Sequence, residues 1–150
     1  MNTLKMYNTV RKLPAGTWLF SKAVCFVAPY FGSIKPHIDD LKPGYCQVRM
    51  KNRRAVRNHF KTAHAIAMCN MAELAGGMMT DVSIPKKARW IPAGMTVKYI
   101  KKAKTDLVAI ADGSQIDWAS NGDIEVPVAV KDNTGDLVFS ALITMNLKQG

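Results

Sequence analysis

The stretch NHFKTAHAIAMCNMAELAGGMMT, residues 58–80, decides the fold. A polar, basic beginning gives way to a helix that is apolar on nearly every side, interrupted only by His64, Asn70 and Glu73. A helix that is apolar all round must be covered all round. The simplest cover is a curved sheet, so we expect this helix to lie inside an α+β domain, with Glu73 buried.

Glu73 is the first candidate for a functional role, because a carboxylate is almost never buried without a partner or a task. Its nine-residue separation from His64 corresponds to about 900° of helical rotation and roughly 13.5 Å of rise. The two side chains therefore point to opposite faces. If they serve one site, a symmetric dimer must bring Glu73 of one copy to His64 of the other. Asn70, one turn before Glu73, is a candidate donor to its carboxylate, and a structural ion pair of Glu73 is the alternative.

The pair Gly76 and Gly77 lies inside the same apolar run. Glycine in a helix costs about 1 kcal/mol relative to alanine and needs a reason. We expect either a close approach of another backbone, such as a second copy of this helix, or a C-terminal cap.

The spacing of Asn58, His64 and Glu73 resembles the Asn…His-Gly-Gly…Asp/Glu signature of hot-dog-fold acyl-CoA thioesterases of the phenylacetate-pathway type. Three flanking stretches resemble, in turn, the opening strands, the strands after the helix and the closing hairpin of that family: APYFGSIKPHIDDLKPGYCQVRMKNR, MTVKYIKKAKTDLVAIA and VAVKDNTGDLVFSALITMNLK. More narrowly, the chain resembles a subgroup of mostly uncharacterised, tetrameric thioesterase-like domains.

The resemblance implies a hot-dog fold, in which an antiparallel sheet of about six strands wraps around the central helix. It also implies hydrolysis of a fatty or aromatic acyl thioester. Glu73 of the partner subunit would attack the thioester or activate water, and the backbone amides of Ala65 and Ile66 would polarise the carbonyl. Asn58 would help to orient that carbonyl, and His64 would either orient the site or simply end the helix.

The chain departs from the family pattern at the two glycines that follow the histidine, which are here Ala65 and Ile66. The Ser or Thr that often positions water is not evident near Pro92, and Thr96 is a weak substitute. A protein that binds acyl-CoA without turnover is therefore the alternative. Dehydration of hydroxyacyl thioesters ranks below hydrolysis, because the spacing follows the thioesterase pattern better.

We expect one domain over residues 1–150, with residues 1–28 as an N-terminal helical extension. Residues 1–13 indicate a short amphipathic helix, and TWLFSKAVCFVAP indicates a helix that docks on the core and is too short to span a bilayer. A signal peptide is the competing interpretation, but Lys22 within the apolar run and the break at residues 14–16 count against it.

The rest of the chain has strand-like patterns. Residues 33–53 predict a hairpin that turns at Pro43-Gly44 and buries one alternating face, Cys46, Val48 and Met50. Residues 80–94 are expected to form a loop. Further strands are expected at residues 95–100, 106–111, 124–131 and 137–147, with a turn at residues 132–135. Pro127 suggests an edge or a bulge rather than a fully paired central position.

The net charge is +10, from 21 Lys and Arg against 11 Asp and Glu, and it favours an anionic partner. Nucleic acid is not expected, because no aromatic or zinc-binding recognition pattern accompanies the charge. We expect the positive charge to hold the phosphates of coenzyme A, with a solvated surface as the alternative. The residues expected to do so are Arg54, Arg57, Lys86, Lys87 and Arg89.

The cysteines Cys25, Cys46 and Cys69 lie far apart without a CxxC motif, which argues against a zinc site and a disulfide framework. His37 and His59 show no ligand spacing either. We therefore expect no metal, no cofactor other than coenzyme A as part of the substrate, and a reducing cytoplasmic location. The expected partners are an acyl-CoA or acyl-carrier thioester and a second copy of the chain, in a dimer or a dimer of dimers.

Overall fold

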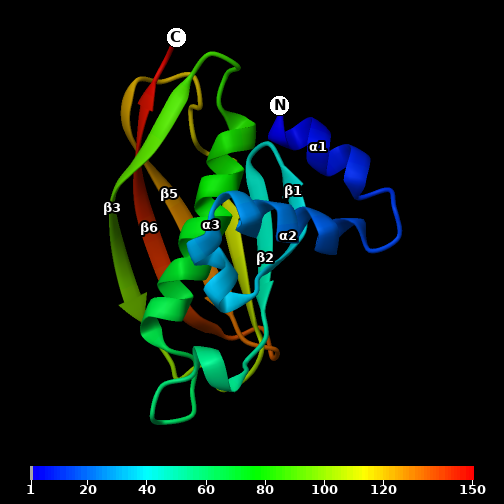
Figure 1. Cartoon of the computed structure of the whole chain (residues 1–150). Coiled ribbons are helices and arrows are strands. Elements are labelled where there is room, and N and C mark those ends of the chain that lie inside the picture. The colour runs from blue at the N-terminus through cyan, green and yellow to red at the C-terminus, as the bar shows by residue number, and fades with distance from the viewer. Residues whose placement is uncertain (1) are drawn as a thin grey trace.

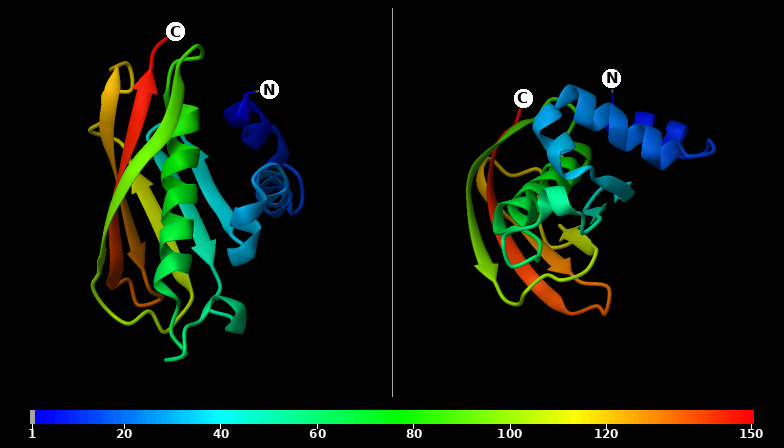
Figure 2. Two further views of the ribbon diagram at one scale, coloured as in Figure 1. Left: turned by 60° about the vertical axis from the view of Figure 1, so that its left-hand side comes forward. Right: turned by 60° about the horizontal axis from the view of Figure 1, so that its bottom comes forward.

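Helix α3 (Ala65–Ser83) runs along the inner face of a curved antiparallel sheet, which wraps around it (Figures 1 and 2). This computed structural model describes residues 2–150. The sheet has six strands in the order β1-β2-β4-β5-β6-β3. The strands are β1 (His37–Lys42), β2 (Tyr45–Met50), β3 (Arg89–Tyr99), β4 (Leu107–Asp112), β5 (Gly122–Lys131) and β6 (Leu137–Lys148). The predicted α+β hot-dog architecture is confirmed.

Alternation along the strands places one face of the sheet against α3. In β2, Cys46, Val48 and Met50 are completely buried, as the sequence predicted, and burial raises the pKa of the Cys46 thiol. The turn into β2 uses Gly44 with φ of +77°, a conformation that favours glycine. The predicted closing turn is also present, since the Gly135 N–H donates to the carbonyl of Asp132 at 3.0 Å.

Strand β3 begins at Arg89, so the predicted loop over residues 80–94 is wrong at both ends. Helix α3 continues to Ser83, and the true connection is short. The strand forms one edge of the sheet and pairs only with β6, and a register shift between Pro92 and Gly94 interrupts the pairing. An edge strand tolerates proline because one side of its backbone has no neighbour.

Pro127 lies in β5, which is an interior strand, but the proline is not fully paired. It faces Leu142 of β6, whereas the pairing of β5 with β4 reaches only to Val128. The missing N–H of proline is tolerated here because β5 has a free flank at this residue.

Two N-terminal helices, α1 (Thr3–Val10) and α2 (Gly16–Val27), stand beside β1 and α3 (Figure 2). The Tyr7 and Phe20 rings meet edge to face with centroids 5.0 Å apart, and both side chains are buried. Burial of the Tyr7 phenol raises its pKa. Short 3-10 turns, η1 (Pro29–Ile34) and η2 (Arg54–Val56), follow α2 and β2. Across residues 2–150 we find no helix with both the length and the hydrophobicity needed to cross a membrane.

Candidate functional site

The N-terminus of α3 begins at Ala65 and is capped by His64. The Nδ1 atom of the imidazole accepts a hydrogen bond from the Ile66 N–H at 3.0 Å, so Nδ1 carries no proton in this arrangement. One of the two amides expected to polarise a carbonyl is thus already paired. The Ala65 N–H is the first of the helix, and Ala65 is one of the residues that line a neighbouring hollow.

Asn58 organises the loop that leads into α3. Its Oδ1 accepts hydrogen bonds from the Phe60 N–H at 3.0 Å and the Thr62 N–H at 3.2 Å, and its Nδ2 donates to the Thr62 hydroxyl at 3.0 Å. The loop closes with Lys61 at φ of +61°. Asn58 is therefore a residue that shapes this loop, and its acceptor oxygen is occupied.

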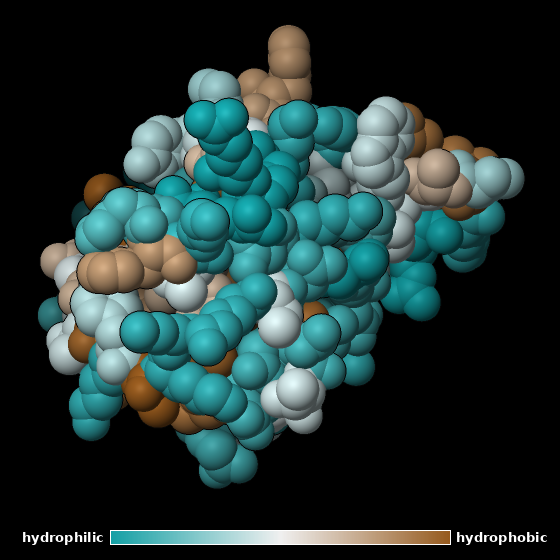
Figure 3. Space-filling view, turned by 90° about the horizontal axis from the view of Figure 1, so that it is seen from below, coloured by the Kyte–Doolittle hydropathy of each residue, from teal (hydrophilic) through white to brown (hydrophobic). Residues whose placement is uncertain are grey.

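A hollow of about 300 Å³ lies beside this loop and the first turn of α3. Asn58, Ala65 and Tyr99 line it, together with Lys101 and Lys102. Seen from this end, the molecule is mostly hydrophilic (Figure 3). The structure thus brings two of the predicted site residues together with two lysines that the sequence analysis did not single out.

The three lysines of residues 101–104 differ in their surroundings. Lys101 forms ion pairs with Asp136 and Asp132, and the pairing with Asp136 raises the pKa of Lys101. Lys102 lies over the Phe60 ring, 5.8 Å from its centroid, and like Lys104 it is exposed and enters none of the ion pairs in the described part of the chain. The run KKAK in the sequence was the available signal for this cluster.

Glu73 is half-buried, and not fully buried as expected. It lies on the wall of a second, larger cavity of about 650 Å³ between α3 and the N-terminal helices. Within residues 2–150 its carboxylate enters no ion pair, which removes the structural ion-pair interpretation for the isolated chain. Because His64 is exposed at the helix end and does not line this cavity, one chain does not bring the two residues together.

Asn70 does not serve Glu73. Asn70 is 6% exposed, and its side-chain Nδ2 donates to the hydroxyl of Ser33, in η1, at 3.2 Å. Its Oδ1 is buried without a hydrogen-bond partner among the described residues. The predicted role of Asn70 as a donor to the carboxylate is therefore wrong: the amide faces η1.

Gly76 and Gly77 lie inside α3, which continues to Ser83, so neither glycine is a C-terminal cap. A Cβ on Gly76 would lie 2.9 Å from Cδ1 of Ile143, and a Cβ on Gly77 would lie 3.0 Å from the Trp90 ring. The predicted close approach of another backbone is not present in the described chain: the atoms that crowd both glycines belong to side chains of the sheet, including Trp90.

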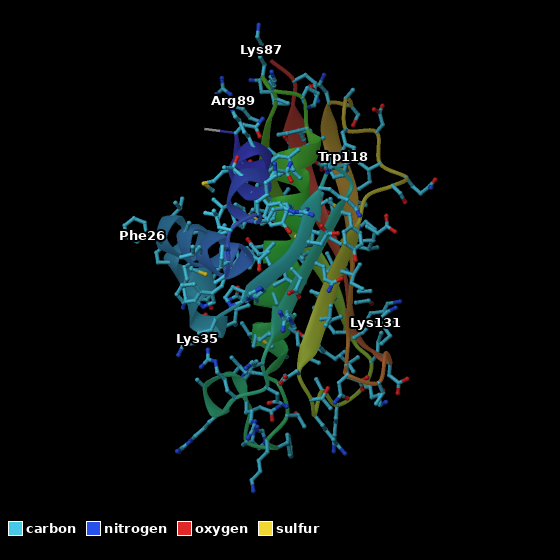
Figure 4. All side chains as sticks on the ribbon, turned by 90° about the vertical axis from the view of Figure 1, so that its right-hand side faces the viewer. Phe26, Lys35, Lys87, Arg89, Trp118 and Lys131 are labelled. Atoms are coloured by element: carbon cyan, nitrogen blue, oxygen red, sulfur yellow. The ribbon has the colours of Figure 1, made fainter. Side chains whose placement is uncertain are left out.

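The predicted phosphate-binding residues fall into two groups at opposite ends of the molecule. Arg54 and Arg57 are exposed near the N-terminus of α3, whereas Lys86, Lys87 and Arg89 follow its C-terminus (Figure 4 labels Lys87 and Arg89). The intervening helix has 19 residues and is about 28 Å long. One chain therefore does not gather all five residues around one ligand.

The groove between α3 and edge strand β3 is partly open. The Sγ of Cys69 on α3 lies 3.9 Å from the hydroxyl of Tyr99 on β3, and this contact raises the pKa of Tyr99. Tyr99 and Met95 of the strand remain exposed, although they face the same side as the core residues of β6. Apolar side chains on an unpaired edge are typical of a surface that another chain covers.

Comparisons with known proteins agree with this architecture. A crystal structure from a genomics programme is 48% identical in sequence, covers 99% of each chain and has a TM-score of 0.89. A Pseudomonas aeruginosa protein of unknown function, described as a probable thioesterase, is 20% identical over 92% of this chain and 97% of its own, with a TM-score of 0.74. A Haemophilus influenzae thioesterase is 10% identical over 80% of this chain and 82% of its own, with a TM-score of 0.71.

The two more distant likenesses show the fold alone, and they confirm the resemblance to hot-dog thioesterases at that level. A search of curated proteins found no match. A family model described as a domain of unknown function, DUF4442, matches residues 16–147. That match covers α3 and all six strands except the last residue of β6. The chain therefore belongs to the DUF4442 family, a domain family of unknown function, and has the hot-dog fold of thioesterases.

Proposed function

We propose that the protein hydrolyses acyl-CoA thioesters at a site shared between two subunits. The observation that carries this proposal is Glu73, a half-buried carboxylate that enters no ion pair within residues 2–150 and lies on the wall of a largely apolar cavity. A general base needs free lone pairs next to a space from which water is largely excluded. The fold shared with thioesterases supports this reaction class.

The geometry of α3 supports an antiparallel second copy, docked through the edge of β3. Such a copy would bring Glu73 of one subunit to the Ala65 amide of the other. That amide, at a helix N-terminus, would stabilise the negative oxygen that forms on the thioester carbonyl. The Ile66 amide would join it once the His64 ring turns aside, and Asn58 would hold the loop in place.

In this mechanism Glu73 takes a proton from water while the water oxygen attacks the carbonyl carbon. The carbon–sulfur bond of the tetrahedral intermediate then breaks, and the thiolate of coenzyme A takes the proton from Glu73. A carboxylic acid and a thiol leave, and the carboxylate is restored. Direct attack by Glu73, through an anhydride that water then opens, is the variant of the same chemistry.

The phosphates of coenzyme A would bind outside the apolar region, at the basic end beside the first turn of α3. Arg54, Arg57, Lys102 and Lys104 are exposed there. In an antiparallel dimer, the partner's group formed by Lys86, Lys87 and Arg89 would approach the same end, which reunites the two groups that one chain keeps apart.

The second candidate function is binding of acyl-CoA without turnover. The pairing of the Ile66 amide with His64 favours it, because an occupied donor does not polarise a carbonyl. A thiol-release screen across short, medium and long acyl-CoAs tests both functions. Release that rises above the uncatalysed rate for one range of chain lengths supports hydrolysis. Tight binding of one acyl-CoA without thiol release above the uncatalysed rate would instead support the second function, binding without turnover.

A further inference from the structure

The larger cavity is built mainly by the N-terminal helices and α3. Its walls come from α1, α2, η1, α3 and Trp90 of β3, and its volume is about 650 Å³. Sites that enclose most of a small-molecule ligand measure about 300–1,000 Å³, so the cavity is of ligand size. The lining is mostly apolar, with Met6, Val24, Leu74 and Met78 among its residues.

This cavity has few polar groups, and the charged residues of its lining are both acidic. Glu73 and Asp81 are the carboxylates of the lining, and they lie two helical turns apart on the same stripe of α3, with Gly77 between them. Asp81 accepts a hydrogen bond from the Trp90 Nε1–H at 3.3 Å, whereas Glu73 enters no ion pair among the described residues. No lysine or arginine is among the residues that line it.

These charges select the kind of occupant. A free fatty acid would bring its carboxylate beside Glu73 without a cation to neutralise either group, which is unfavourable in a region of low dielectric. An uncharged acyl group has no such cost. Two methionine side chains, of Met6 and Met78, can adapt to a flexible chain because their thioethers are unbranched and polarizable.

We infer that this cavity holds the acyl chain of a thioester, and that the subunit providing Glu73 also provides the acyl pocket. The inference rests on the proposed function. In this arrangement two subunits bind different parts of one substrate. The acyl group lies under α1 and α2 of one subunit, and the coenzyme A part lies along the basic end of the other. The pocket is open at its rim, where Phe26 and Val27 are 89% and 84% exposed and Phe26 points away from the body of the molecule (Figure 4).

The position of the pocket makes the N-terminal helices determinants of chain-length selectivity. Ala23 of α2 is exposed and lines the cavity, so a larger side chain there reduces the volume with little disturbance of the core. Met78 of α3 is half-buried, and shortening it enlarges the same volume. The two changes should therefore act in opposite directions.

The test uses S-alkyl-CoA thioethers of increasing chain length, which bind without being hydrolysed, and measures their affinity by calorimetry. For the unmodified protein, affinity should rise by about fourfold for each added methylene until the pocket is full, and then level off. Ala23→Phe should level off at a shorter chain and Met78→Ala at a longer one. Leu142→Phe, on the outer face of the sheet, is the matched control and should leave the profile unchanged.

The outcomes separate this inference from the proposed function. Opposite shifts of the plateau in a protein that releases no thiol from any acyl-CoA would support the pocket and defeat the hydrolase. An unshifted plateau in well-folded Ala23→Phe and Met78→Ala proteins would overturn the pocket, even if the enzyme is active. A plateau that moves in Leu142→Phe instead would also overturn it, because the chain would then lie on the outer face.

Discussion

Replacing Glu73 by glutamine tests the proposed chemistry, because it keeps the shape of the side chain and removes its charge. The structure sets the expected effect on stability. Glu73 is half-buried and enters no ion pair within residues 2–150, so the free energy of unfolding should change by no more than about 0.5 kcal/mol. Loss of a buried ion pair would instead cost about 3–5 kcal/mol and lower the Tm by roughly 6–20 °C.

The expected effect on activity is much larger. Loss of a general base lowers the rate by about 10²- to 10⁴-fold, which corresponds to roughly 3–5 kcal/mol of activation free energy. Affinity for an S-alkyl-CoA thioether should be nearly unchanged. Thiol release and thermal melting should be measured on the same preparation of Glu73→Gln, so that lost activity is not confused with lost folding. A stable and fully active variant would refute the role of Glu73 and the mechanism built on it.

Mixing two inactive variants tests whether the site is shared. Ala65→Pro removes the first amide of α3, and proline is well tolerated at the first position of a helix. In a mixed dimer of Glu73→Gln and Ala65→Pro chains, one of the two sites keeps both an intact carboxylate and an intact amide. Random mixing should therefore restore about a quarter of the original activity. If the mixture stays as inactive as its components, the carboxylate and the amide do not meet across subunits.

Three further predictions concern assembly, phosphate binding and packing. In an antiparallel dimer that places Glu73 of one subunit opposite Ala65 of the other, the two copies of Cys69 face each other, because residue 69 lies midway between residues 65 and 73. A short thiol crosslinker should therefore join the two Cys69 side chains. A stable monomer in sedimentation equilibrium would contradict this. Neutralising Lys102 and Lys104 should raise the KM for acyl-CoA by about two- to fivefold per lysine, with kcat unchanged and the effect lost at high salt. Gly76→Ala should destabilise by up to about 2 kcal/mol in chemical unfolding, because crowding against the sheet outweighs the gain in helix propensity. Gly94→Ala, which has open space around its Cβ, should not destabilise the fold.

The paired strands were predictable because their burial follows a simple alternation. The residues of β2 alternate between core and solvent, and Pro43-Gly44 marks the turn before it. The beginning of β3 was not predictable in this way. Apart from the half-buried Trp90, its first residues are exposed, and RWIPAG carries Pro92 and Gly94, which are loop signals in any strand that has two neighbours.

The environment of Glu73 could be predicted only in part. The sequence showed that a carboxylate interrupts an apolar helix, and the helix is covered on most sides but remains partly open beside β3. The degree of burial of Glu73 depends on how closely α1 and α2 approach α3, and this packing distance is not encoded in any local pattern.

The contact of Asn70 could not be predicted for a similar reason, because its hydrogen bond to Ser33 is a tertiary contact. The lysines at residues 101–104 were visible as a run, but their position next to Ala65 depends on the topology of the sheet.

A rigid helix explains why the proposed site would need two subunits. The N–H groups that can stabilise an anion exist only in the first turn of α3, and that turn is at the hydrophilic end of the molecule. Glu73 lies about 12 Å further along, on the wall of the apolar cavity that α1 and α2 help to form. Moving the carboxylate to the first turn would expose it to water, whereas moving the amides inward is impossible because interior amides are bonded within the helix. The antiparallel second copy that we propose would join the exposed amides of one subunit to the shielded carboxylate of the other without changing either environment.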